Sequence, residues 1–311
     1  MESLTELFTY ILQNLINALQ RGSFYAVISI GYSMVYGVLM LFNFAHGDIF
    51  MVGTYIGFGI ATLFLALFAG FLPGPLIFVA TVIVTMFLAS WIGVFVEVAG
   101  YRPLRSAPRA SAAITGLMIG IIFETGILII VGAQRLKFPA LMETVSYNVG
   151  GVYFTNVKIM IIVISLLLML ALHGFIQKSK WGMAMRAMSY DFLAVPLMGV
   201  SINIIAPLTF AVGAGLASVA GILYGQAYPI LDPYMGVLLG WKAFVAAILG
   251  GRGSIKGAAL AGYLLGFIEI FVATIFPSTL RDLIAYSIII LILTYKPRGF
   301  FGMEHSTKLR L

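Results

Sequence analysis

Cysteine is absent from this chain of 311 residues, and charged residues make up only 9% of it. The lack of cysteine excludes disulfides, iron–sulfur centres and thiolate metal sites. A soluble globular protein carries about 25% charged residues, whereas 61% of this chain is hydrophobic. Too few charges remain to cover a water-exposed surface, so the bilayer must be the solvent for most of the chain.

Recognisable catalytic and metal-binding motifs are missing as well. The three histidines, His46, His173 and His305, lie far apart in the chain, so we expect no metal site. The sequence contains no Ser-His-Asp spacing, no His-Glu-x-x-His and no paired-carboxylate motif, which argues against an enzyme. Segment 250–257 is glycine-rich but lacks the Gly-Lys-Ser/Thr end of a phosphate-binding loop, so we expect no nucleotide or other cofactor in this chain.

Long apolar runs dominate what is present. They are too long and unbroken for the alternating pattern of a membrane β-barrel, and most reach the roughly 20 residues that a spanning helix needs. The sequence therefore predicts a single domain over 1–311: an all-α polytopic integral membrane protein, a bundle of eight to ten transmembrane or half-membrane helices. The runs are 22–42, 49–72, 75–98, 111–133, 156–176, 193–226, 237–249, 257–276 and 283–295.

The N-terminal segment 4–20 has apolar residues at helical spacing and polar residues on the opposite face. This pattern predicts an amphipathic helix. Such a helix either lies in the membrane interface, which we favour, or packs its polar face into the bundle. We expect no cleavable signal peptide, because Glu2 and Glu6 occupy the place of a basic n-region.

Basic residues predict the orientation of the chain. Lysine and arginine concentrate in loops 99–110 and 177–192 and in the C-terminal tail, which should therefore be cytoplasmic. Loops 134–155 and 227–236 should face outward. The net charge of +7 comes without a long Lys/Arg cluster, so we expect a membrane protein that meets lipid and no nucleic acid.

A polar, glycine-containing break separates the first two apolar runs at segment 43–48. Asp48 is expected mainly to cap the following helix, because a carboxylate accepts bonds from the free amides there. A second possibility is direct contact of His46 or Asp48 with a substrate. Together with Asn43, these residues are candidates for a hinge, a gate or the translocation path.

Ionisable residues inside apolar runs are a further signal, because burying them in a membrane is costly and usually serves a function. Glu124 and Glu269 lie deepest by position, and either could line the translocation path, carry a proton or make an interhelical bond. Glu97 lies near Arg102 and is expected to be structural. The full set is Arg21, Glu97, Glu124, Lys242 and Glu269.

Segment 178–200 is predicted to form a cytoplasmic helix. Trp181, Met185, Met188, Phe192 and Val195 recur at steps of three and four and therefore share one face. This face either docks a partner or lies flat against the bundle or the membrane. The candidate docking residues are Trp181, Met185, Arg186, Met188, Asp191 and Phe192.

Four motifs together resemble the permeases of branched-chain amino acid ABC transporters (LivH-type). They are Gly-Tyr-Ser-Met-Val-Tyr-Gly at 31–37, Asn-Phe-Ala-His-Gly-Asp at 43–48, Tyr-Arg-Pro-Leu-Arg at 101–105 and the run Ala243–Ala258. The likeness extends over about residues 8–302. It implies an ATP-driven importer of the cytoplasmic (inner) membrane that works by alternating access. Its other parts would be a second homologous permease subunit, an extracytoplasmic substrate-binding protein and two cytoplasmic ATPase subunits that hold ATP and Mg²⁺.

The resemblance also implies roles for segments of this chain. It makes 178–200 the coupling helix that meets an ATPase, although Met183 and Pro196 depart from the usual pattern. The glycine-rich break at Gly250, Gly251, Gly253 and Ser254 is a second candidate hinge or gate. Permeases for urea and short amides share these motifs, so they remain an alternative. A proton-coupled secondary transporter using Glu124 or Glu269 is another.

Overall fold

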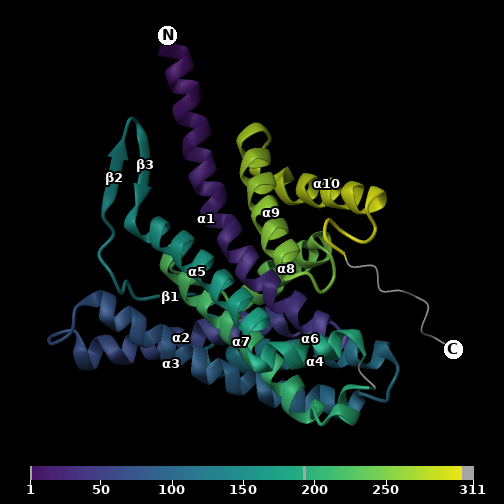
Figure 1. Ribbon diagram of the computed structural model, residues 1–311. Helices are drawn as coiled ribbons and strands as arrows, with labels where there is room; N and C mark the ends of the chain where they lie inside the picture. Colours follow the sequence, from purple (N-terminus) through teal and green to yellow (C-terminus); the bar gives the residue numbers. More distant parts are fainter. Residues whose placement is uncertain (1, 192–193, 303–311) are drawn as a thin grey trace.

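The computed structural model describes residues 2–191 and 194–302, and this part of the chain is mostly helical (Figure 1). Within these residues, eight helical segments are long and apolar enough to cross a membrane, and α8 is a shorter apolar helix. These findings confirm the predicted all-α polytopic membrane fold. The main helices are α1 (Glu2–Leu39), α2 (His46–Phe68), α3 (Gly74–Phe95), α4 (Arg109–Val131), α5 (Asn156–Lys178), α6 (Lys180–Tyr190), α7 (Ile202–Ala227), α8 (Met235–Gly250), α9 (Ile255–Ile275) and α10 (Arg281–Tyr295).

Short elements join these helices. A π-helical turn, η1, extends α3, and single 3-10 turns, η2, η3 and η4, precede α4, α7 and α10. Two small antiparallel pairs of strands are present: β1 pairs with β4, and β2 with β3 in a hairpin whose turn has Gly150 and Gly151 at positive φ. The bounds are η1 (Val96–Tyr101), η2 (Arg102–Leu104), η3 (Val195–Met198), η4 (Ser278–Leu280), β1 (Leu136–Lys137), β2 (Ser146–Val149), β3 (Val152–Thr155) and β4 (Ile230–Leu231).

The centre of the bundle is built around α1 and α7. In their most apolar stretches, 83% and 72% of the residues are buried, against 11% for both α4 and α10. The backbones of α1 and α9 meet at glycines: a Cβ on Gly262 or Gly266 would overlap the α1 backbone at Ala26 or Gly22. Small residues permit this close approach. Helix α4 is left on the outside of the subunit with an apolar surface.

Two ends of the bundle can be distinguished by their contacts. At the first, here called the α6 end, α6 packs against the last turn of α1 and the first turn of α7. At the second, here called the hairpin end, lie the β1–β4 pair and the β2–β3 hairpin, whose strand β3 contacts α1 and α5. Basic residues of segments 102–105, 178–186 and 252–256 gather at the α6 end. The basic residues that concentrate in particular loops of the sequence therefore lie together at one end of the folded bundle.

The amphipathic segment 4–20 does not form a separate helix, because α1 is continuous from Glu2 to Leu39. Its polar face meets the hairpin end: Gln13 exchanges two hydrogen bonds of 2.8 Å with the backbone of Tyr153, and Lys158 donates to Asn17 at 2.7 Å. Part of the polar face, at Gln13 and Asn17, therefore packs against the hairpin and α5, as in the alternative arrangement. Residues 5–8 remain exposed, and their placement in the membrane interface stays a prediction.

Candidate functional site

A cavity of about 290 Å³ opens on one side of the bundle. It lies between the start of α2, the middle of α4 and α8, with one side chain from α1. The lining residues Ile121 and Trp241 are 51% and 44% exposed, so the cavity reaches the surface of the subunit. The lining consists of Tyr32, Phe44, Gly47, Asp48, Leu117, Met118, Ile121, Glu124, Gly236, Val237, Gly240, Trp241 and Phe244.

Asp48 lies in the first turn of α2 but does not cap it. The N-cap residue is Ala45, and no side chain caps this helix. The expected capping role is therefore wrong, because the helix begins three residues earlier than the apolar run suggested. The carboxylate of Asp48 lines the cavity instead, where its Oδ1 has no hydrogen-bond partner in the described part of the chain.

Glycines of two other helices hold the Asp48 carboxylate in place. A Cβ on Gly120 of α4 would overlap Oδ2, and a Cβ on Gly236 of α8 would lie 2.8 Å from Oδ1. A Cβ on Gly47, beside Asp48, would lie 2.7 Å from the Cα of Gly240. The start of α2 is therefore packed against α8 backbone to backbone, and the carboxylate lies between α4 and α8, where the two glycines leave room for it.

Glu124 of α4 is the second acid of the cavity. Its carboxyl group is close enough to that of Asp48 for the two to interact, although 76 positions separate them in the chain. Two neighbouring carboxylates repel each other unless a proton or a cation lies between them. Among the residues that line the cavity there is no lysine, arginine or histidine to neutralise them.

Aromatic side chains form the wall opposite α4. Phe244 is at the centre: its ring lies 5.7 Å from Tyr32, 5.2 Å from Phe44 and 5.7 Å from Trp241, measured between ring centroids. The hydroxyl of Tyr32 also accepts a hydrogen bond from the amide of Gly47 at 3.2 Å. The cavity thus combines an aromatic wall, aliphatic side chains and two carboxyl groups, which resembles a small-molecule site.

The other two candidates of the 43–48 break do not line this cavity. His46 is 1% exposed and packs its ring against Tyr32 at 4.6 Å, within the core between α1 and α7. Asn43 accepts hydrogen bonds from Tyr101 at 3.1 Å and from the amide of Ala45 at 3.2 Å. These bonds hold the bend between α1 and α2 in shape, so the direct contacts favour a structural role for both residues.

Glu269 lies in a buried network of charges away from the cavity. It pairs with Lys242 of α8 at 2.7 Å and with Arg21 of α1 at 3.2 Å, and it accepts a hydrogen bond from Tyr25 at 2.8 Å. Lys242 also contacts Asp282 of α10 at 2.9 Å. The network joins four helices. Glu269 therefore makes the interhelical bonds that were one of the roles considered for it from the sequence.

Glu97 has the structural role expected for it. The residue is 1% exposed and pairs with both Arg102, at 3.2 Å, and Arg105. Arg105 continues to the side chain of Asn203 at the start of α7, at 2.7 Å. This cluster fastens the end of α3 to α7 at the α6 end.

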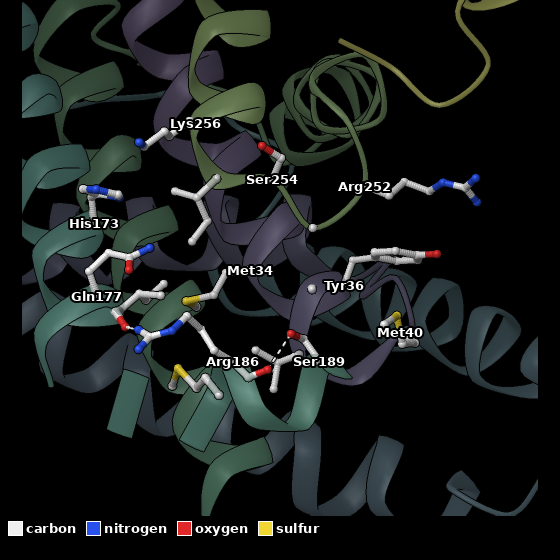
Figure 2. A pocket seen from close by; sticks show the side chains of 16 residues that line it. Met34, Tyr36, Met40, His173, Gln177, Arg186, Ser189, Arg252, Ser254 and Lys256 are labelled. Atoms are coloured by element: carbon white, nitrogen blue, oxygen red, sulfur yellow. Dashed lines mark hydrogen bonds between the residues drawn. The ribbon is translucent and has the colours of Figure 1, made fainter. Parts of the chain in front are cut away.

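A second recess, of about 230 Å³, lies at the α6 end between α1, α5, α6 and the turn that joins α8 to α9 (Figure 2). Lys256 and His173 lie on one side of it, and Arg186 enters from α6. Arg252 points away on the other side, with its guanidinium 6.0 Å from the centre of the Tyr36 ring. The recess brings two sets of candidates together, those of the 178–200 segment and those of the glycine-rich turn.

The turn at 250–254 is tightly built. Gly251 and Gly253 have φ of 105° and 84°, a left-handed conformation that other residues rarely adopt. A Cβ on Gly250 would overlap the backbone of Gly257 in the next helix. Ser254 caps α9 by accepting a hydrogen bond from the Gly257 amide at 3.1 Å.

The C-terminal segment after α10 holds this turn from the other side. The amides of Phe300 and Phe301 donate to the carbonyls of Leu249 and Gly250 at 2.9 and 3.0 Å. The turn is therefore fixed by backbone bonds on both sides. A hinge or gate at Gly250, Gly251, Gly253 and Ser254 stays a prediction.

The methionine stripe of segment 178–200 faces the bundle. Met185 and Met188 are each 1% exposed and pack with Val38 of α1 and Ile205 of α7. This is the alternative in which the stripe lies against the protein, and it removes both methionines from the surface on which a partner could dock. Helix α6 itself ends at Tyr190, well before residue 200.

The remaining docking candidates lie in different places. Trp181 is 49% exposed, and Arg186 turns inward and donates to the carbonyl of Ile176. Asp191 ends α6 and accepts a hydrogen bond from the amide of Ala194 at 2.9 Å. Phe192 lies outside the described residues. The large apolar side chains that α6 does expose are Trp181, Met183 and Tyr190, at 49%, 63% and 85%.

Sequence reasoning missed most of the cavity. Tyr32 and Phe44 belong to the motifs at 31–37 and 43–48, but an aromatic residue within a motif does not by itself predict the wall of a cavity. Trp241 and Phe244 lie in an ordinary apolar run and Gly120 in another, and nothing local distinguishes them from residues that face lipid. Only the packing of α2, α4 and α8 brings them together.

Comparison with known proteins identifies the family. Residues 14–293 match the family of the branched-chain amino acid transport system permease component. The chain belongs to this family. It is 38% identical over 307 residues to the permease protein BraD of a high-affinity branched-chain amino acid transport system in Pseudomonas aeruginosa, with 97% of this chain and 99% of BraD covered.

Other relatives carry similar names. The LivH permease of Escherichia coli K12 is 35% identical over 310 residues, covering 98% of this chain and all of LivH. A probable permease LivM of Methanocaldococcus jannaschii is 25% identical over 313 residues, covering 88% of this chain and 89% of the relative. No solved structure matches the chain. The relatives are transport permease subunits rather than enzymes, and they belong to transport systems with several components.

Proposed function

We propose that this chain is a membrane subunit of an ATP-driven importer that moves branched-chain amino acids inward across the cytoplasmic membrane by alternating access. The observation that carries the proposal is the similarity to the BraD and LivH permeases over nearly the full length. Expressed together with the other components of such an importer, the protein should take up leucine, isoleucine or valine with an absolute need for ATP. Uptake of urea instead would mean a different substrate, and collapse with an uncoupler while ATP is maintained would mean a proton-coupled carrier.

The cavity supplies this subunit's share of the translocation path, and a second permease of the family completes it. In support, the cavity opens beside α4, of which only 11% is buried in its most apolar stretch. Leu117 and Ile121 of α4 are 40% and 51% exposed at the cavity, and Trp241 of α8 is 44% exposed beside them. The exposed apolar face of α4 lies next to the two carboxyl groups of the cavity. A helix of a partner subunit could cover such a surface better than lipid could.

The ATPase docks on the exposed face of α6 that carries Met183 and Tyr190. This face differs from the methionine stripe, so the test uses different residues. The pair Met183→Asp and Tyr190→Asp should lower co-purification of the ATPase about tenfold or more, since losing apolar anchors at an interface has effects of this size. The permease should still elute as a single species from size-exclusion chromatography.

The matched control is Met183→Leu with Tyr190→Phe, which keeps both side chains apolar and should retain the ATPase. If the aspartate pair co-purified as much ATPase as the unchanged protein, α6 would not be the docking element. Aspartate at Met185 or Met188 would not test docking, because both positions are buried and a buried charge would destabilise the fold itself.

The orientation places the α6 end and the C-terminus in the cytoplasm and the hairpin end outside. The chain has no cysteine, so one introduced thiol reports its own side of the membrane. In intact cells a membrane-impermeant maleimide should label Tyr147→Cys, at the exposed hairpin, and leave Lys296→Cys unlabelled. Permeabilised cells should label both, and labelling of Lys296→Cys alone in intact cells would reverse the orientation.

A further inference from the structure

The Asp48 carboxylate occupies an unusual environment for a charged group. Its residue is 7% exposed, its Oδ1 lacks a hydrogen-bond partner among the described residues, and glycines of α4 and α8 hold it at the cavity wall. A buried carboxylate oxygen without a partner is costly. Oδ1 lies at the cavity wall, where a group from outside this chain can reach it.

Glu124 narrows down the chemistry of that group. Its carboxyl group interacts with that of Asp48, and no cationic side chain lines the cavity around them. Two neighbouring acidic groups repel each other unless they share a proton, and the negative charge that remains on the pair attracts a cation. A metal ion is a poor match, since calcium takes six to eight oxygen ligands and no group of three or more metal-ligating side chains occurs within the described residues.

The rest of the lining indicates what kind of cation fits. Tyr32, Phe44, Phe244 and Trp241 form an aromatic wall, and aromatic faces attract ammonium groups within about 6 Å. Leu117, Met118, Ile121 and Val237 complete an apolar surface. The cavity therefore suits a small organic ammonium ion that carries an apolar group.

We propose that Asp48 and Glu124 receive the α-ammonium group of the amino acid as it passes through the permease, with its aliphatic side chain against the aromatic wall. The inference rests on the proposed function. It goes further by naming Asp48 and Glu124 as the residues that recognise the ammonium group of the substrate. The substrate's own carboxylate would be repelled by this pair. It must be oriented away from the pair, toward the open side of the cavity.

The first test is transport by the complete transporter in liposomes with its binding protein. Asp48→Asn and Glu124→Gln keep the shape of each side chain and remove its charge. Each should lower leucine uptake about tenfold or more, while ATP hydrolysis stimulated by the binding protein stays within about threefold of the unchanged complex, since only a contact with the substrate is lost. A transporter with Glu124→Asp, which keeps the charge, should take up more leucine than one with Glu124→Gln. The matched control is Glu6→Gln: Glu6 is exposed and far from the cavity in sequence, so uptake should be normal.

Two results would overturn the inference: uptake by both neutral variants close to that of the unchanged transporter, or a parallel loss of uptake and ATP hydrolysis. Failure of the proposed function is a separate outcome, because the unchanged transporter would then show no ATP-dependent leucine uptake at all.

The second test asks for the ammonium group directly, without the binding protein. A ligand that binds the folded state raises its unfolding temperature. At matched concentration, 3-methylbutylamine should raise the unfolding temperature of the permease complex, and 4-methylpentanoate, which has the same carbon skeleton with a carboxylate in place of the amine, should not. The shift should vanish in the Asp48→Asn, Glu124→Gln double variant. Equal shifts for both compounds, no shift with the amine, or a shift that survives in the double variant would contradict the proposal.

Discussion

Replacing Glu269 with alanine should destabilise the folded permease by at least about 3 kcal/mol, because removing one partner of a buried ion pair typically costs about 3–5 kcal/mol. Lys242 is 7% exposed at its side chain and would lose its 2.7 Å partner, and Arg21 and Tyr25 would lose the same carboxylate. The measurement is the temperature at which the detergent-solubilised protein stops eluting as a single peak after heating.

The control for this change is a pair at the surface. Arg135 and Asp232 are 3.7 Å apart with side chains 72% and 42% exposed, so Arg135→Ala should cost no more than about 1 kcal/mol. A double variant, Lys242→Met with Glu269→Leu, removes the buried pair altogether and should recover part of the loss. If the Glu269→Ala protein were as stable as the Arg135→Ala control, the Glu269 ion pairs would not stabilise the fold. A role of Glu269 in carrying protons would then be the better explanation.

The second large effect is expected where α1 crosses α9. A Cβ at Gly266 would overlap the backbone nitrogen and Cα of Gly22, and backbone atoms cannot move aside as a flexible side chain can. Gly266→Val should therefore push the helices apart and disturb the Arg21–Glu269 pair nearby. The cost should reach or exceed the upper part of the range of about 1–3 kcal/mol usual for overpacking, and the yield of monodisperse protein should drop sharply.

Gly59→Val in α2 is the matched control, because a Cβ there meets no atom within 4 Å. Both substitutions place a β-branched residue inside a helix, so they share the same change in helix propensity. A yield for Gly266→Val equal to that of Gly59→Val would mean that α1 and α9 are not packed backbone to backbone.

The sequence predicted the class of fold because the signal is local. Apolar runs of spanning length and the distribution of basic residues follow from composition along the chain. The pairing of Glu97 could also be anticipated, since Arg102 and Arg105 follow within eight residues. For Glu269 the sequence left proton transfer and an ion pair open, because its partners Arg21 and Lys242 lie 248 and 27 positions away.

The candidate site was harder to predict because tertiary packing decides it. Periodicity placed Met185 and Met188 on one face correctly, but it could not tell whether that face meets a partner or α1 and α7. Asp48 looked like a helix cap because its neighbours are apolar from Ile49 onward, whereas α2 begins at His46. The meeting of Asp48 with Glu124 depends on Gly120 and Gly236, which give no sign of this role in the sequence.

The unbroken α1 has a mechanical consequence. A helix of 38 residues is about 57 Å long at 1.5 Å per residue. Near one end, Gln13 is bonded to β3 of the hairpin, and near the other, Val38 packs against the methionines of α6. One continuous helix therefore contacts both ends of the bundle. A displacement of α6 would be passed along α1 to the hairpin end without an intervening loop.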